Sequence, residues 1–226
     1  MKTDRKILLA PSLLSADFAK LGDEVKKCET GGCDILHADI MDGHFVPNIT
    51  FGPLVVKAIK PHSNLPIDCH LMIENPNKYI EAFAKAGADY ISVHAEGLAH
   101  AHRSLSLIKE CGAKAGLALN PITPIEFAFE AAEYCDFILL MSVNPGFGGQ
   151  KFINSFLRRA EALREFLIKN GLEHVVIEVD GGVKIDNVEQ IVRAGADMIV
   201  SGSGLFRGDF NANAKQMRAN AEKGLI

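Results

Sequence analysis

The stretch Gly87-Ala88-Asp89-Tyr90-Ile91 decides the fold, because the same phrase returns along the chain. Gly195-Ala196-Asp197-Met198-Ile199 repeats it, Gly32-Cys33-Asp34-Ile35-Leu36 follows the same pattern, and Gly112-Ala113-Lys114 is a looser copy. In each copy a glycine that can end a helix precedes an acidic or polar residue and an apolar run typical of a buried strand. The repeat therefore predicts helices that alternate with the strands of a parallel sheet.

The segments between these phrases carry helical spacing. Phe156, Ala160, Leu163 and Leu167 form one apolar stripe, which Gly171 closes. Thr123-Pro124-Ile125-Glu126 predicts a capping box at the start of another helix, with proline in its first turn.

Eight strands are expected, most of them followed by a helix, which is the repeat of a (β/α)8 TIM barrel. They are expected near residues 7–10, 34–39, 66–71, 89–94, 114–119, 136–142, 174–179 and 197–201. No linker or low-complexity tract divides residues 1–226, so we expect one domain. A doubly wound open sheet is the alternative, but its glycine-rich first turn is missing from Pro11-Ser12-Leu13-Leu14-Ser15.

Composition and charge exclude several classes of protein. The chain has 226 residues, of which 48% are hydrophobic, a content unlike that of a disordered chain. Its formal net charge is −4, which disfavours binding to nucleic acid or to anionic membranes. Five cysteines without a CxxC pair indicate a reducing compartment. The first six residues are interpreted as a charged lead-in to a strand, and no apolar run approaches the ~20 residues of a membrane span. We expect a cytoplasmic protein with no nucleic-acid or membrane partner.

Polar side chains gather where the predicted strands end, and in a barrel these ends carry the chemistry. One strand ends with His37 and Asp39 on the same face, the next ends with His70, and the seventh ends with Asp180. Leaving two imidazoles and two carboxylates unpaired there would be costly, and one divalent cation resolves the cost. Zn, Fe(II), Mn and Co all suit this ligand set. His94 ends the fourth strand, where it could reach the same pocket.

Met41, Met72 and Met141 also stand at strand ends. They are compatible with ordinary core packing and with an apolar lining that excludes water above the metal.

Three glycine-rich turns follow the last three strands: Asn144-Pro145-Gly146-Phe147-Gly148-Gly149-Gln150, Asp180-Gly181-Gly182 and Ser201-Gly202-Ser203-Gly204. Loops at these positions, with a short extra helix, make a common phosphate site in barrels. Backbone N–H groups can hold a phosphate dianion without lysine or arginine, so a net-acidic chain can still bind a phosphate ester.

Longer motifs make the chain resemble the ribulose-phosphate 3-epimerase family over essentially its whole length. These motifs are residues 11–17, His37-Ala38-Asp39-Ile40-Met41-Asp42-Gly43-His44-Phe45-Val46-Pro47-Asn48, His70-Leu71-Met72, residues 116–121, residues 141–150 and Glu178-Val179-Asp180-Gly181-Gly182-Val183. The resemblance implies a ribulose-phosphate-binding barrel that interconverts D-ribulose 5-phosphate and D-xylulose 5-phosphate. It also implies a homo-oligomer, dimeric or hexameric.

The resemblance further implies roles for single residues. His37, Asp39, His70 and Asp180 would bind the metal, and Asp39 and Asp180 would be the two acid/base residues. The substrate-binding residues would be Ser12, His70, Gly146, Phe147, Gly148, Gly149, Asp180, Gly181, Gly182, Gly202 and Ser203.

Inversion at C3 beside a C2 ketone needs one acid/base group on each face of a planar ene-diolate, and Asp39 and Asp180 come from strands that could flank it. The nearest alternative is a D-allulose 6-phosphate 3-epimerase, with one more carbon in its substrate. A decarboxylating or aldol-cleaving barrel would usually present a lysine near the chemistry, and none ends the second, third or seventh strand. A catalytically silent sugar-phosphate sensor would need no paired bases.

Overall fold

The computed structural model describes residues 5–225, so the first four residues of the predicted lead-in lie outside the described part of the chain. Eight parallel strands form one sheet in the order β1-β8-β7-β6-β5-β4-β3-β2. They are β1 (Leu8–Pro11), β2 (Leu36–Met41), β3 (Ile67–Met72), β4 (Tyr90–His94), β5 (Lys114–Leu119), β6 (Phe137–Met141), β7 (Val176–Asp180) and β8 (Met198–Ser201). Each begins and ends within two residues of its predicted position, which confirms the eight-strand prediction.

The sheet curls until its two edge strands meet. The N–H of Asp34 donates to the carbonyl of Leu9 over 3.0 Å, and Ser12 forms an isolated parallel bridge with His37. These contacts join β1 to β2 and leave the barrel nearly closed. The TIM-barrel prediction is therefore confirmed, and the open doubly wound sheet is excluded.

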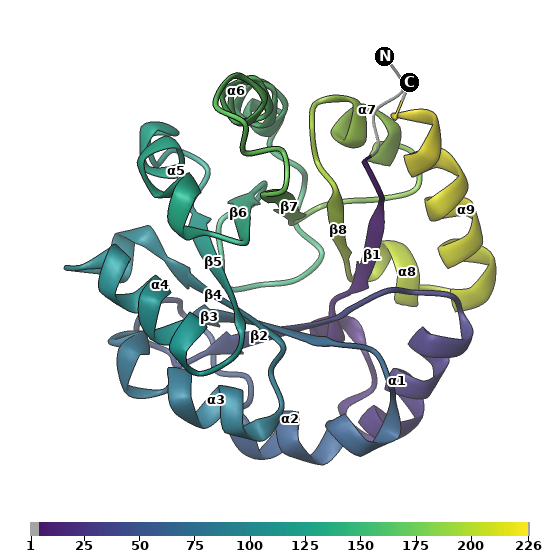
Figure 1. The fold of residues 1–226 in the computed structure, drawn as a ribbon. Helices are drawn as coiled ribbons and strands as arrows, with labels where there is room; N and C mark the ends of the chain where they lie inside the picture. The colour runs from purple at the N-terminus through teal and green to yellow at the C-terminus, as the bar shows by residue number, and fades with distance from the viewer. Residues whose placement is uncertain (1–4, 226) are drawn as a thin grey trace.

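Helices surround the strands as an outer ring, which Figure 1 shows with the first and last elements side by side. The α-helices are α1 (Leu21–Thr30), α2 (Pro53–Ile59), α3 (Ile80–Ala86), α4 (Ala101–Glu110), α5 (Glu126–Ala131), α6 (Ser155–Lys169), α7 (Val188–Arg193), α8 (Ser203–Phe206) and α9 (Phe210–Lys223). The predicted stripe on α6 is buried against the barrel. Most strand residues are buried as well, because helices cover one face of the sheet and barrel side chains fill the other.

An aspartate that precedes each even-numbered strand ties down the start of the odd-numbered strand before it. Its carboxylate accepts a hydrogen bond from a backbone N–H that the parallel ladder leaves without a partner. The pairs are Asp34 with Leu9 (2.8 Å), Asp89 with Ile67 (2.8 Å), Asp136 with Ala115 (2.8 Å) and Asp197 with Ile177 (3.0 Å). The aspartate of the repeated phrase thus builds the end of the barrel opposite to the strands' carboxyl ends.

The predicted capping box at residues 123–126 is wrong. Helix α5 begins at Glu126 without a side-chain cap, and the hydroxyl of Thr123 donates instead to the carboxylate of Glu96. The Glu96 carboxylate, just after β4, is a charged acceptor. A hydrogen bond to it is stronger than the one that the Thr123 oxygen would accept from a backbone N–H of its own turn.

The five cysteines are all free thiols, and four of them are buried. Burial raises the pKa of the Cys28 thiol well above its ordinary value, so this thiol stays protonated. Within residues 5–225, no helix has the length and apolar character that a membrane span requires.

Candidate active site

A cleft of about 520 Å³ opens over the carboxyl ends of the strands. Its floor holds Asp39 and Asp180, and the three methionines Met41, Met72 and Met141 form apolar parts of its lining. The predicted substrate-binding residues that line it are Ser12, Gly146, Phe147, Gly148, Gly149, Asp180, Gly181, Gly182, Gly202 and Ser203. His70 is the exception, because it lies fully buried below the floor together with His37.

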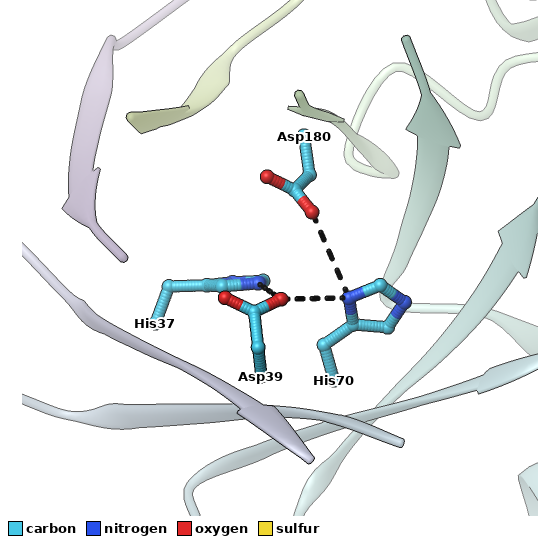
Figure 2. A group of neighbouring side chains, drawn as sticks. All are labelled: His37, Asp39, His70 and Asp180. Atoms are coloured by element: carbon cyan, nitrogen blue, oxygen red, sulfur yellow. Dashed lines mark ion pairs between the residues drawn. The ribbon is translucent and has the colours of Figure 1, made fainter. Parts of the chain in front are cut away.

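Four side chains from three strands point at one another, as Figure 2 shows. Asp39 Oδ1 lies 3.4 Å from His37 Nε2 and 3.4 Å from His70 Nδ1. Asp180 Oδ2 reaches down to 3.8 Å from the same His70 Nδ1. The structure thus brings together all four residues that the sequence predicted as metal ligands.

The two facing imidazole nitrogens have no hydrogen-bond partner. His37 Nε2 and His70 Nδ1 are both buried and unsatisfied among the described residues. The four potential ligand atoms all lie within 4.8 Å of one another. A buried polar atom without a partner costs free energy, and a divalent cation bound between these four groups would remove that cost. The residues present therefore fit a metal ion.

His37 is held from behind by two further buried acids. Its Nδ1 lies 2.6 Å from Asp68 Oδ2 and 3.3 Å from Glu178 Oε1. This contact orients the ring so that Nε2 faces Asp39, which is the arrangement in which a carboxylate supports a metal-binding histidine. Burial and the charge of Asp68 raise the pKa of Glu178 well above its ordinary value, which favours a neutral, protonated Glu178.

The two aspartates of the floor differ electrostatically. Burial acts to raise the pKa of Asp39, but His37 and His70 outweigh it and lower that pKa below its ordinary value. Burial and the charge of Asp39 raise the pKa of Asp180 to about 7. Burial lowers the pKa of His70 to about 4, so its imidazole is neutral and keeps a lone pair. The site thus offers one firmly ionised carboxylate and a second one that protonates easily.

The glycine-rich turns after β6, β7 and β8 form the opposite wall of the cleft. Gly182 has φ = +64°, and a Cβ atom there would stand 2.5 Å from the backbone nitrogen of Phe152. A Cβ on Gly202 would stand 2.3 Å from Ser15 Oγ. At Gly182 only glycine lets the two backbone segments approach so closely, whereas at Gly202 a Cβ would meet the Ser15 side chain. The short helix α8 begins directly after Gly202. Among the described residues that line the cleft there is no lysine or arginine.

Comparison with known proteins decides the family. The family sequence model described as "Ribulose-phosphate 3 epimerase family" matches residues 8–206 of this chain. This chain belongs to the ribulose-phosphate 3-epimerase family. Ribulose-phosphate 3-epimerase of Bacillus subtilis is 54% identical over 200 residues, covering 88% of this chain and 92% of that protein. The enzyme of the same name from a Synechocystis species is 53% identical over 212 residues, covering 93% and 92%.

Membership makes the chain an epimerase, an isomerase-class enzyme, which confirms the resemblance drawn from the motifs. Among solved structures, 3-hexulose-6-phosphate synthase superposes with a TM-score of 0.69 over 95% of this chain and 99% of that one. Its sequence identity is only 22%, so this likeness concerns the barrel fold alone.

Sequence reasoning did not assign a supporting role to four residues behind the site of this epimerase, of which three are buried and Glu96 is exposed. Asp68 and Glu178 lie behind His37, and His94 and Glu96 continue from His70 toward the surface. The alternation that paired His37 with Asp39 also pairs Asp68 with His70 and Glu178 with Asp180. That signal could have placed Asp68 and Glu178 inside the barrel. The sequence placed His94 where it could reach the pocket, and in the structure it meets His70 beneath the floor instead.

Proposed function

We propose that this chain interconverts D-ribulose 5-phosphate and D-xylulose 5-phosphate by proton transfer at C3, with Asp39 and Asp180 as the two acid/base residues. The observation that carries the proposal is the approach of these carboxylates from β2 and β7, which are not neighbours in the sheet. Both reach the same point, marked by His70 Nδ1, at 3.4 and 3.8 Å. Groups that enter a pocket from separate strands can serve the two faces of one planar intermediate.

Four residues would hold a divalent cation in this proposal: His37 through Nε2, His70 through Nδ1, and Asp39 and Asp180 through one oxygen each. When bound, the cation would supply Lewis-acid stabilisation of the negative charge that develops on the substrate oxygens. The ligand set suits Zn, Fe(II), Mn or Co.

The aspartates do the proton chemistry. In one direction the first takes the C3 proton, the electron pair of the C3–H bond forms a C2–C3 double bond, and the π pair of the C2 carbonyl moves onto its oxygen to give an ene-diolate. The carbonyl then re-forms as the second aspartate delivers a proton to the other face of C3. The reverse reaction exchanges their roles. Ser12 donates to Asp39 Oδ2 over 2.6 Å and so fixes the direction of that carboxylate. Met41, Met72 and Met141 line the cleft and limit the entry of water, which would otherwise compete for the ene-diolate.

The phosphate of the substrate is proposed to lie against the turns at Gly146–Gly149, Gly181–Gly182 and Gly202–Ser203. Because no cationic side chain lines the cleft among the described residues, backbone N–H groups and serine hydroxyls are the available donors. At the start of α8 the Ser203 and Gly204 N–H groups lie at this turn, while those of Leu205 and Phe206 already donate to the carbonyl of Gly202.

D-allulose 6-phosphate, with one more carbon, would meet the same acid/base residues. The ratio of kcat/KM for the two sugar phosphates distinguishes the two enzymes, and we expect kcat/KM to be higher for the five-carbon substrate.

We also propose a homo-oligomer, consistent with the strong exposure of apolar Leu54 (85%) and Ile122 (94%). Light scattering on the purified protein measures its mass.

Metal removal tests the proposal. Exhaustive chelation should abolish epimerisation, and a divalent transition metal should restore it. Asp39→Asn and Asp180→Asn should each lose activity, with metal content measured for both because the residues are proposed ligands. Asp23→Asn, which changes an exposed carboxylate on α1, is the control and should keep full activity. Full activity in protein shown to be metal-free by elemental analysis would remove the cation from the proposal.

A further inference from the structure

A chain of hydrogen-bonding groups runs from His70 toward the protein surface. His70 Nδ1 faces the two aspartates, while its Nε2 lies 2.8 Å from Nε2 of His94. The two rings stack with centroids 4.9 Å apart, and His94 is only 2% exposed. Nδ1 of His94 lies 3.1 Å from Oε2 of Glu96, which follows β4 in a 3-10 turn at Ala95–Gly97.

Glu96 is held as an acceptor by its other oxygen. Oε1 accepts hydrogen bonds from the Asn120 N–H at 2.7 Å and from the hydroxyl of Thr123. Arg159 fixes these two donors in turn, because its guanidinium donates to both of their carbonyls over 2.7 Å. Burial acts to raise the pKa of Glu96, but the hydrogen bonds from His94, Thr123 and Asn120 outweigh it and lower the pKa to about 2.

Glu96 determines which atom donates the proton in each hydrogen bond between Glu96, His94 and His70. A carboxylate can only accept, so Nδ1 of His94 must carry the proton between them. A neutral His94 then has a bare Nε2, which accepts from Nε2–H of His70. His70 in that tautomer presents an unprotonated Nδ1 to Asp39 and Asp180, which is the atom proposed to bind the cation.

We propose that Glu96 and His94 are positioning residues that fix the tautomer of His70 and thereby set the affinity of the floor for a divalent cation. This inference rests on the proposed metal site. Neither residue touches the substrate or the cation. Their effect resembles that of other groups that hydrogen-bond to a metal-binding histidine, whose loss weakens metal binding about 10- to 100-fold.

Two substitutions of Glu96 separate this role from simple structural support. In Glu96→Gln the amide oxygen is expected to keep the two donors Asn120 and Thr123. Its NH₂ group then faces His94 Nδ1 and donates to it. That reverses the chain and places a proton on His70 Nδ1, where it competes with the cation. Glu96→Ala removes the acceptor without supplying a donor. The near-isosteric glutamine is therefore expected to weaken metal binding more than alanine does.

The experiment measures zinc dissociation constants by competition with a chelator, for the wild-type protein, Glu96→Gln, Glu96→Ala and Asp39→Asn. We expect an increase of about 10-fold for Glu96→Ala and about 100-fold for Glu96→Gln. Glu81→Gln, at an exposed ion pair with Lys85, is the matched control and should bind as the wild type does. Nitrogen-15 NMR of the zinc-loaded wild type should show His94 with its proton on Nδ1, a reading that needs no variant to fold.

The outcomes distinguish the inference from the function on which it rests. If the wild type binds no zinc, or binds it equally well after Asp39→Asn, the proposed metal site is wrong. If the wild type binds zinc through Asp39 but Glu96→Gln binds it as tightly, only the positioning role is overturned. A weaker effect of glutamine than of alanine, or a proton on Nε2 of His94, would overturn it as well.

Discussion

Ser12 Oγ donates a hydrogen bond to Oδ2 of Asp39 over 2.6 Å, across the seam where β1 meets β2. The bond occupies one oxygen of the carboxylate and leaves Oδ1 facing the two imidazoles at 3.4 Å. Both partners are buried, so the geometry is fixed before any substrate enters. The contact thus orients a proposed base at the seam where the barrel closes.

Ser12→Ala should lower kcat/KM about 10- to 100-fold, because a hydrogen bond to a charged group is worth about 1.5–3 kcal/mol. Steady-state kinetics on D-ribulose 5-phosphate measure this effect. Ser106→Ala, on the outer helix α4, is the control and should leave kcat/KM unchanged. Equal kinetics for both variants would show that Asp39 does not need the serine.

Asn48 links the loop after β2 to the loop over residues 143–151, since its side-chain amide donates to the carbonyl of Gly146 over 2.8 Å. We expect the 143–151 loop to act as a lid that closes on ligand. A bound substrate analogue should slow amide exchange in this loop more than elsewhere. In Asn48→Ala this slowing should be several-fold smaller. Asn64→Ala is the control, because the Asn64 side-chain amide donates to Glu29 outside the lining of the cleft. Exchange that stays the same at saturating analogue would contradict closure.

Gly182→Ala should raise KM and lower the free energy of unfolding by about 1–3 kcal/mol, because its φ is +64° and the new Cβ would meet the backbone of Phe152. Gly171→Ala is the matched control. It has a similar φ of +69° but open space around the position, away from the cleft. The control should lose stability and keep its KM. A normal KM in Gly182→Ala would contradict the proposed phosphate site.

Glu96 should also leave a signature in the pH dependence of stability. Its pKa is lowered from 4.5 to about 2, so the folded state favours the charged form. The resulting stability is complete above pH 4.5 and is lost as the pH falls toward 2. Urea unfolding of the metal-free protein should give a constant difference between wild type and Glu96→Ala from pH 7 to about 5. Below that, the difference should shrink by about 1–2 kcal/mol in all, allowing for solvent screening at this partly exposed group. A difference that grows on acidification would contradict the assignment.

Much of the fold follows from local signals. Glycine-ended helices before apolar runs, as at Gly87 and Gly195, located the strands, because helix termination and strand burial are read from neighbouring residues. The hydrogen bonds that Asp89 and Asp197 of the same repeated phrase accept were not predictable in this way. Each bonds a strand that begins about 20 residues earlier, and only the packed barrel brings the two together.

The site divides along the same line. His37, Asp39, His70 and Asp180 could be predicted because strand alternation places each of them on the inward face of its strand. Glu96 could not, since it lies beyond β4 in a short turn and contacts His94, Asn120 and Thr123 only through the fold. The failed capping box at Thr123 had the same cause, because a distant acceptor, the Glu96 carboxylate, displaced the local backbone N–H donor.

The central claim is that Asp39 and Asp180 serve opposite faces of C3, and solvent isotope exchange tests it most directly. D-ribulose 5-phosphate is turned over in D₂O by the metal-loaded enzyme, and NMR follows deuterium at C3 of the D-xylulose 5-phosphate formed early. With two bases, nearly every product molecule should carry solvent deuterium at C3. Substantial transfer of the original C3 proton to the product, with metal fully bound, would mean that a single base serves both faces and would contradict the claim.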